Sequence, residues 1–214
     1  MWFVPEASVL LAYSLACLVL FITPGPDMSL FLAKTVAGGR RAGIAAYIGA
    51  SLGCIVHSLL AALGISALLA ASPAAFLALK VVGAAYLLWL AVDAVRNGSS
   101  LNVRARHTRA SAAFWPTLLL GLGVNMTNPK VVLFFVTFLP QFVDVGDPHA
   151  AAKLLFLGIY FVVFSFPLGI ALILGAERVV TGLKSRPRVL RAIDWLFAGV
   201  FSAFAIRILA VQGR

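Results

Sequence analysis

Two short clusters along the chain combine helix-breaking residues with a single charged side chain. The first consists of Pro24, Gly25, Pro26 and Asp27, and the second of Asn125, Asn128, Pro129 and Lys130. Both interrupt apolar runs that otherwise have the composition of bilayer-spanning helices. Proline removes an intrahelical hydrogen bond, and backbone groups freed at membrane depth must be satisfied by protein or by a water-filled cavity. Because charged and amide groups at such breaks are suited to bind small charged solutes, we expect a binding site here.

Each cluster also has a simpler interpretation. Asp27 follows its break directly, where the dipole of a restarting helix favours a carboxylate, so it can serve as a helix cap alone. Asn125 and Asn128 can satisfy the backbone groups that Pro129 frees, while Lys130 can extend its ammonium group to the membrane surface. We favour a functional role for both clusters, because their polarity exceeds what capping and packing require.

The sequence leaves open whether Asp27 and Lys130 meet. Each lies late in its own apolar run, and the two runs are expected to cross the bilayer in opposite directions. Straight helices would place the two charges toward opposite faces, so they meet only if the breaks bring both inward. The alternative is a pair of half-sites at the two ends of a central cavity.

Composition identifies the class of protein that carries these clusters. Of 214 residues, 62% are hydrophobic and 11% are charged, whereas soluble domains are about half apolar and about a quarter charged. The mean hydropathy is +1.04. We therefore expect an integral membrane protein with apolar segments along its whole length. The net charge of +10 comes from basic residues in short loops, which indicates membrane orientation rather than a nucleic-acid partner.

Six apolar runs are long enough to span a bilayer, for which about 20 helical residues are needed. They cover Ser8–Ala33, Gly43–Ala70, Ala74–Val95, Ala113–Leu139, Ala151–Ala176 and Ala192–Val211. Basic residues concentrate in the first, third and fifth connections, and the other connections are short or acidic. The positive-inside rule then predicts cytoplasmic odd-numbered loops and both termini on the outer side. Because the N-terminus lacks a basic segment, we expect the first span to be retained rather than cleaved as a signal peptide.

A polar segment divides the chain into two halves. Residues 8–96 and 113–211 each hold three expected spans and are joined by the basic, cytoplasmic loop 97–112. Three spans per half place the halves in opposite orientations, and Pro26–Phe31 aligns weakly with Pro129–Phe134. We therefore predict a single all-α transmembrane domain of six helices in two inverted three-helix repeats. Its first and fourth helices are expected to be broken at the proline motifs.

The remaining reactive side chains are expected to be structural. Cys17 and Cys54 both fall inside apolar runs, as small buried hydrophobes do. His57 shares a span with Gly49 and Gly53, a spacing typical of close helix packing, and we favour a hydrogen-bonded packing role for it over proton relay. The sequence has no metal-binding, hydrolase or nucleotide-binding motif, so we predict no metal, no cofactor and no enzymatic activity.

The residues around both breaks resemble one family. Phe21–Met28 (FITPGPDM), Asn128–Lys130 and Phe134–Gln141 (FFVTFLPQ) look like segments of the LysE/RhtB family of bacterial amino-acid exporters. The likeness extends over essentially the whole chain in length, number of spans and basic central loop. It implies a multi-pass protein of the bacterial inner membrane that exports an amino acid or derivative, such as threonine, homoserine, homoserine lactone, leucine or lysine. It also implies coupling to the proton motive force.

We therefore predict a secondary-active exporter whose partners are an amino acid or derivative, protons and the lipid bilayer; a homo-oligomer is compatible with the sequence. Asp27 would bind the substrate's ammonium group or carry the proton, and Lys130 would bind its carboxylate or act as a substitute cation in the empty site. The alternative is an intramembrane enzyme acting on a lipid or prenyl phosphate, with Lys130 on the phosphate and Asp27 or His57 as base. A structural or scaffold protein would leave the two charged breaks unexplained.

Overall fold

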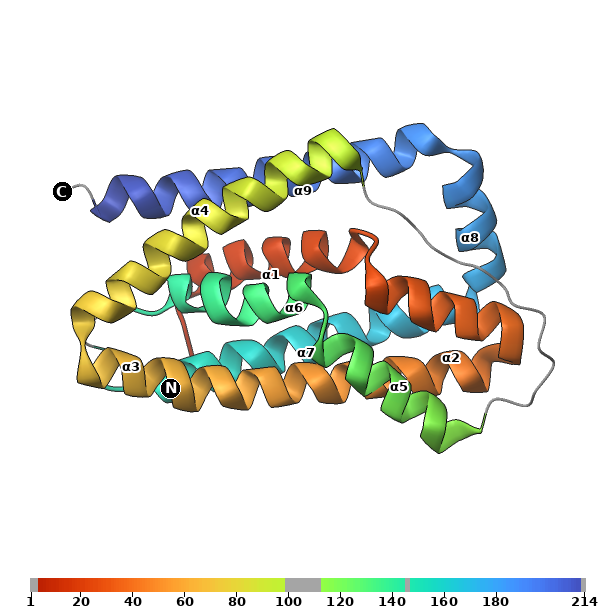
Figure 1. Ribbon diagram of the computed structural model, residues 1–214, viewed down its shortest axis with the longest axis horizontal. Coiled ribbons are helices and arrows are strands. Elements are labelled where there is room, and N and C mark those ends of the chain that lie inside the picture. Colours follow the sequence, from red (N-terminus) through yellow and green to blue (C-terminus); the bar gives the residue numbers. More distant parts are fainter. Residues whose placement is uncertain (1–3, 99–112, 145–146, 213–214) are drawn as a thin grey trace.

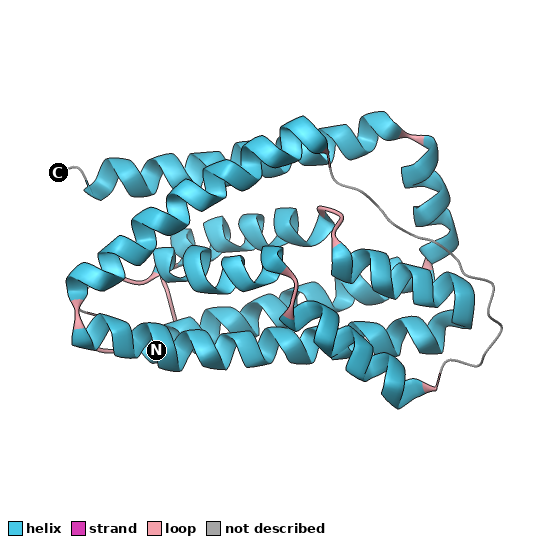
Figure 2. Cartoon of the chain, viewed as in Figure 1, coloured by secondary structure: helices cyan, strands magenta, loops and turns pink. Residues whose placement is uncertain are grey.

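The computed structural model describes residues 4–98, 113–144 and 147–212, and every regular element in these ranges is helical (Figures 1 and 2). The all-α prediction is thus confirmed for the described part of the chain. The expected central loop, residues 97–112, lies almost entirely outside it. The helices are α1 (Ala7–Ile22), α2 (Pro26–Leu60), α3 (Ser66–Ala71), α4 (Pro73–Asn97), α5 (Phe114–Met126), α6 (Pro129–Leu133), α7 (Ala150–Leu174), α8 (Ala176–Ser185) and α9 (Pro187–Gln212). Single π-helical turns, Ala61–Ile65 and Phe134–Phe138, extend α2 and α6, and the 3₁₀ turn Leu139–Phe142 follows the second.

Several of these helices have the length and composition of membrane spans. Four are long and apolar enough to cross a bilayer, or five if the bent pair on either side of the second break forms one span. α1 is apolar but has only 16 residues, which cover about 24 Å at helical rise. A bilayer core is about 30 Å thick, so α1 alone is short for a span. The chain is therefore a multi-pass membrane protein.

Proline chemistry accounts for the breaks in both apolar runs. Thr23 and Asn128 each precede a proline and are extended, with ψ of 117° and 109°, because the proline ring disfavours the helical conformation of the residue before it. Pro26 and Pro129 occupy the first turns of α2 and α6, where the missing N–H would be unpaired in any case. The segments before and after the second break differ in direction by 55°. Both predicted breaks are thus present.

α2 reverses direction at a single glycine. Gly39 has φ 79° and ψ 175°, a conformation that glycine adopts without steric cost. Residues 26–38 and 40–60, here called the first and second arms of α2, run in opposite directions (Figure 1). The predicted boundary between the first two spans, a loop from Lys34 to Ala42, is wrong. The chain stays helical on both sides of Gly39, and one residue makes the turn.

The second arm of α2 lies between α5 and α7 and packs against both. A Cβ atom at Gly49 would lie 2.0 Å from the carbonyl oxygen of Leu118 in α5, and one at Gly121 of α5 would lie 2.1 Å from that of Ala46. Because no side chain fits at either position, the two backbones approach each other closely, as small residues permit in membranes. The packing interpretation of Gly49 is confirmed.

Buried apolar side chains form two clusters. The larger cluster gathers side chains from α1, α4, α7, α9 and the turns after α6, including Tyr13, Phe134, Leu157 and Phe201. The smaller cluster joins α2, α7 and α8 and consists of Met28, Phe31, Leu32, Ala46, Tyr47, Ile173, Ala176 and Val180. It lies toward α8 and the turn at Gly39, which occupy the same end of the molecule in Figure 1.

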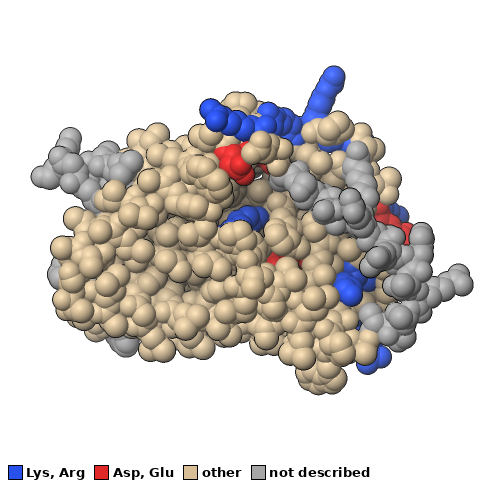
Figure 3. All heavy atoms as spheres, viewed as in Figure 1, with Lys and Arg blue, Asp and Glu red and all other residues tan. Residues whose placement is uncertain are grey.

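Basic side chains mark the end of the molecule that holds the smaller cluster, here called the basic end. Arg40 and Arg41 follow the turn at Gly39, Arg178 lies on α8, and Arg186 and Arg188 lie where α8 meets α9; all five are exposed. The face drawn in Figure 3 shows no Lys or Arg side chain of the described residues at the end opposite the basic end, where α3 meets α4. The uneven distribution agrees with a chain oriented by charge.

Candidate functional site

The two breaks lie side by side, and each supplies hydrogen-bonding groups to the other. Lys130, from the second break, donates from Nζ to the backbone oxygens of Leu20 (2.9 Å) and Thr23 (2.6 Å) at the end of α1. Asp27, from the first break, accepts at Oδ2 from the Nδ2 groups of Asn125 (2.8 Å) and Asn128 (3.1 Å). The ends of four helices are thus joined by side chains that cross from one break to the other.

Helix ends complement both charges. Lys130 lies against the C-terminal carbonyls of α1, which carry partial negative charge, and Asp27 lies in the first turn of α2, where the backbone carries partial positive charge. Asn128 in turn caps α6, because its Oδ1 accepts from the backbone N–H of Lys130 at 3.1 Å. Among the described residues, no direct ion pair joins Asp27 to Lys130. The question left open by the sequence is therefore answered: both charges enter one site, but each is held by other groups.

Both charged groups keep hydrogen-bonding capacity that the described protein groups do not use. Asp27 Oδ1 is buried and has no hydrogen-bond partner. Lys130 Nζ has three donors, and two of them are taken by the end of α1. A buried carboxylate oxygen without a partner is costly unless water or a ligand satisfies it. The pair can therefore offer one acceptor and one donor to a zwitterionic molecule.

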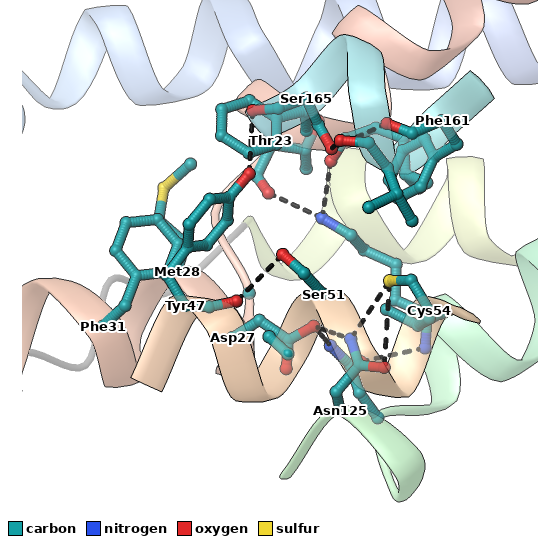
Figure 4. A pocket seen from close by; sticks show the side chains of 18 residues that line it. Thr23, Asp27, Met28, Phe31, Tyr47, Ser51, Cys54, Asn125, Phe161 and Ser165 are labelled. Carbon is teal, nitrogen blue, oxygen red and sulfur yellow. Dashed lines mark hydrogen bonds between the residues drawn. The ribbon is translucent and has the colours of Figure 1, made fainter. Parts of the chain in front are cut away.

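A cavity of about 70 Å³ lies at these groups, and both polar and apolar side chains line it (Figure 4). It has room for a few water molecules. Its polar lining consists of Thr23, Asp27, Tyr47, Ser51, Cys54, Asn125, Asn128, Lys130 and Ser165. Its apolar lining consists of Leu20, Phe21, Met28, Phe31, Ala50, Val131, Phe161 and Val162, with Gly25 at the break itself. The lining thus combines groups that suit an α-amino acid head group with groups that suit an apolar side chain.

The predicted site residues divide into two groups. Gly25, Asp27, Asn125, Asn128 and Lys130 line the cavity. The prolines at positions 24, 26 and 129 are absent from its lining and act on the backbone, by ending one helix and starting the next.

The part of the cavity lining that the second arm of α2 contributes was not predicted from the sequence. Tyr47, Ser51 and Cys54 all line the cavity, and Figure 4 shows them projecting from one face of that arm. The signal was present, because their spacing of four and then three residues puts polar groups on one face of an apolar helix. Asn125 Nδ2 lies 3.5 Å from Cys54 Sγ, so the interpretation of Cys54 as a simple packing residue is incomplete.

His57 packs as expected and hydrogen-bonds the backbone of Asn125. Its ring stacks on that of Phe135, with centroids 5.6 Å apart and planes 21° apart. The imidazole is buried, and its Nε2 atom has no hydrogen-bond partner among the described groups. The packing role is confirmed.

Comparison with known proteins adds independent information to this geometry. The family model described as LysE type translocator matches residues 18–212. A leucine efflux protein of Klebsiella pneumoniae is 32% identical over 208 residues, covering 94% of this chain and 95% of that protein. An uncharacterised membrane protein of Pseudomonas aeruginosa is 31% identical over 203 residues, covering 92% of both chains. Another from Vibrio cholerae is 34% identical over 145 residues, covering 67% of this chain and 69% of its own.

No solved structure matches the chain. The family match covers both breaks and every element that lines the cavity, and relatives of this kind are transporters rather than enzymes. The intramembrane enzyme considered as an alternative is therefore excluded. Because the family model matches residues 18–212 and a relative is 32% identical over 94% of this chain, this chain belongs to the LysE type translocator family.

Proposed function

We propose that this translocator exports an amino acid with an apolar side chain across the bacterial inner membrane, driven by the proton motive force. The observation that carries the proposal is the crossed hydrogen bonding between the breaks, which leaves Asp27 Oδ1 without a partner at the cavity. In this proposal the substrate's ammonium group binds Asp27. Its carboxylate binds the remaining donor of Lys130, and its side chain lies against apolar residues of the lining.

The apolar residues of the cavity lining support the choice of side chain. Phe21, Met28, Phe31, Phe161 and Val162 are among the apolar residues that line the cavity. A hydroxyl or charged side chain placed there would lose its hydrogen bonds to water without replacement. The similarity to a leucine efflux protein of Klebsiella pneumoniae agrees with a branched aliphatic substrate.

We propose six membrane spans in two inverted repeats. α1 together with the first arm of α2 would form the first span, and α5 together with α6 and the turns after it the fourth. Both would be broken at their midpoints by proline. The second arm of α2, α4, α7 and α9 supply the other four. The basic end would face the cytoplasm, which follows from the positive-inside rule.

Asp27 is proposed to couple substrate movement to protons. A carboxylate can hold either a proton or an ammonium group, but not both at the same oxygen. Competition between the two at Asp27 makes release of substrate to the outside depend on proton uptake there, and reloading from the cytoplasm depend on proton release. Lys130 keeps the end of α1 satisfied when the site is empty, because its two bonds to that helix do not involve substrate.

Transport by the purified protein in liposomes tests this proposal. Asp27→Asn keeps the size and much of the hydrogen bonding of the side chain but cannot titrate. We expect the variant to insert normally, to lose accumulation of leucine driven by a pH gradient, and to retain downhill exchange; Asp27→Glu should retain partial activity. The matched control is Asp93→Asn, because Asp93 is a carboxylate at the end of α4 that bonds Asn97 and lies outside the cavity. Undiminished leucine accumulation by Asp27→Asn would falsify the coupling role and leave Asp27 as a helix cap.

A further inference from the structure

We propose that Tyr47 is the gate residue at the basic end of the cavity, and that release of its hydrogen bond to α7 opens the cavity on that side. Tyr47 belongs both to the cavity lining and to the smaller apolar cluster. Along the second arm of α2 it lies between the exposed Arg41 and the cavity residues Ser51 and Cys54. The Tyr47 side chain therefore stands between the cavity and the basic end.

The contacts of Tyr47 fasten α2 to α7. Its hydroxyl donates to the backbone oxygen of Ser165 at 2.7 Å, and the side chain is buried. Its ring meets that of Phe31, in the first arm of α2, at a centroid distance of 5.2 Å. A Cβ atom at Gly169 would lie 2.1 Å from Cζ of Tyr47. The ring is thus confined between α7 and the first arm, and the space exists only because residue 169 is glycine.

A second tyrosine makes a matching hydrogen bond to α7 on the other side of the cavity. The hydroxyl of Tyr13, also fully buried, donates to the backbone oxygen of Leu157 in α7 at 3.0 Å. Leu157 and Ser165 are eight residues apart, or about 12 Å along a helix, and the cavity residues Phe161 and Val162 lie between them. Two tyrosines therefore hold α7 on either side of the cavity, one in each apolar cluster.

The surroundings of Tyr13 and Tyr47 differ. Tyr13 belongs to the larger cluster, where the rings of Phe134, Phe142 and Tyr160 surround it. Tyr47 also has three ring neighbours, Phe21, Phe31 and Phe166, but it belongs to the smaller cluster, and α7 carries Pro167 two residues after Ser165. Proline removes a hydrogen bond from the helix and makes it easier to bend at that point. The side at Tyr47 is therefore the one with the smaller apolar cluster, and α7 can bend there.

Thiol labelling of Cys54 measures this opening directly. The chain has two cysteines, so Cys17→Ala leaves Cys54, in the cavity lining, as the reporter. A membrane-impermeant maleimide is added to oriented vesicles from either side, and the labelling rate is compared between variants. Loss of one buried hydrogen bond shifts an opening equilibrium by about 2- to 10-fold. We expect Tyr47→Phe to raise labelling from the basic end by this factor and to leave labelling from the other side unchanged.

Three further variants keep the test independent of any single substitution. Gly169→Ala should also raise labelling from the basic end, because the new methyl group displaces the Tyr47 ring, and Pro167→Ala should lower it by restoring the helix bond. Tyr13→Phe is the matched control and should leave labelling from the basic end unchanged. The inference is overturned if Tyr47→Phe and Gly169→Ala leave the rate unchanged, if they raise it equally from both sides, or if Tyr13→Phe raises it equally from the basic end.

The role of this gate, which would be to admit substrate from the cytoplasm, rests on the proposed function. Its test needs neither substrate nor a pH gradient. Labelling results can therefore contradict the gate without affecting the proposals for leucine transport and for coupling at Asp27. Transport results can likewise contradict those proposals without affecting the labelling result.

Discussion

Gly121→Ala should separate two helices and disable the site one turn away. The added Cβ atom would lie 2.1 Å from the Ala46 carbonyl oxygen and 3.0 Å from its Cα. These are backbone atoms that cannot rotate aside, so α5 must move away from α2 by about 1 Å or more to reach van der Waals distance. Overpacking of this kind costs about 1–3 kcal/mol. We therefore expect a less stable protein with normal membrane insertion.

The same movement reaches the site through Asn125. It lies one helical turn beyond Gly121, and its Nδ2 is 2.8 Å from Asp27 Oδ2. An increase of about 1 Å takes this distance beyond hydrogen-bonding range. A hydrogen bond to a charged group contributes about 1.5–3 kcal/mol, so we expect leucine counterflow to fall by about tenfold or more.

Gly123→Ala provides the matched control for Gly121→Ala. Gly123 lies on the same helix, and a Cβ atom there would meet nothing within 4 Å. Stability is measured by denaturant titration in detergent micelles, and transport by counterflow in liposomes. Equal stability and equal transport in the two variants would refute the packing argument, because only one of them introduces a contact with the second arm of α2.

The remaining predictions concern charge. Lys130→Met leaves two carbonyl oxygens at the end of α1 without this donor; we expect a thermal stability loss equivalent to about 1–3 kcal/mol and no counterflow, with partial recovery in Lys130→Arg. Partial burial raises the pKa of Asp147, but hydrogen bonds from Lys153 and a backbone N–H outweigh it and hold the pKa below its usual range. The stabilisation is therefore present at neutral pH and lost below about pH 4, so acid should increase proteolysis at Asp144–His149 in the wild type more than in Asp147→Asn. Reporter fusions should place the same loop outside the cell, and a cytoplasmic result would contradict the six-span proposal.

Local chemistry made the helix breaks predictable. A proline affects its own residue and the one before it, so Pro24 and Pro129 determine where α1 and α5 end whatever surrounds them. The turn at Gly39 was not predicted, because the expected loop was drawn from polarity. Lysine and arginine are good helix formers, and Lys34 and Arg40 accordingly lie in helical backbone. Polarity alone does not end a helix.

The hydrogen bonds across the cavity depend on tertiary structure, which explains why the sequence left them open. Asp27 and Asn125 are 98 residues apart, and their contact requires the two broken helices to lie side by side. Tyr47 and Ser165 are 118 residues apart, and nothing in the local sequence of either residue indicates the other. What the sequence did contain was the polar face of the second arm, which becomes visible only when Tyr47, Ser51 and Cys54 are considered together rather than singly.

Exchanging the charges of Asp27 and Lys130 would not rebuild the site, because the two positions tolerate change unequally. The partners of Asp27 are side-chain amides, and the amide of Asn125 can rotate to present its oxygen in place of its nitrogen. The partners of Lys130 are backbone oxygens at the end of α1, which cannot be inverted and would repel a carboxylate. Position 130 is therefore restricted to donors, whereas position 27 is open to neutral replacements. Descendants of this sequence can lose or alter the proposed proton coupling at residue 27 while the scaffold that Lys130 holds together is preserved.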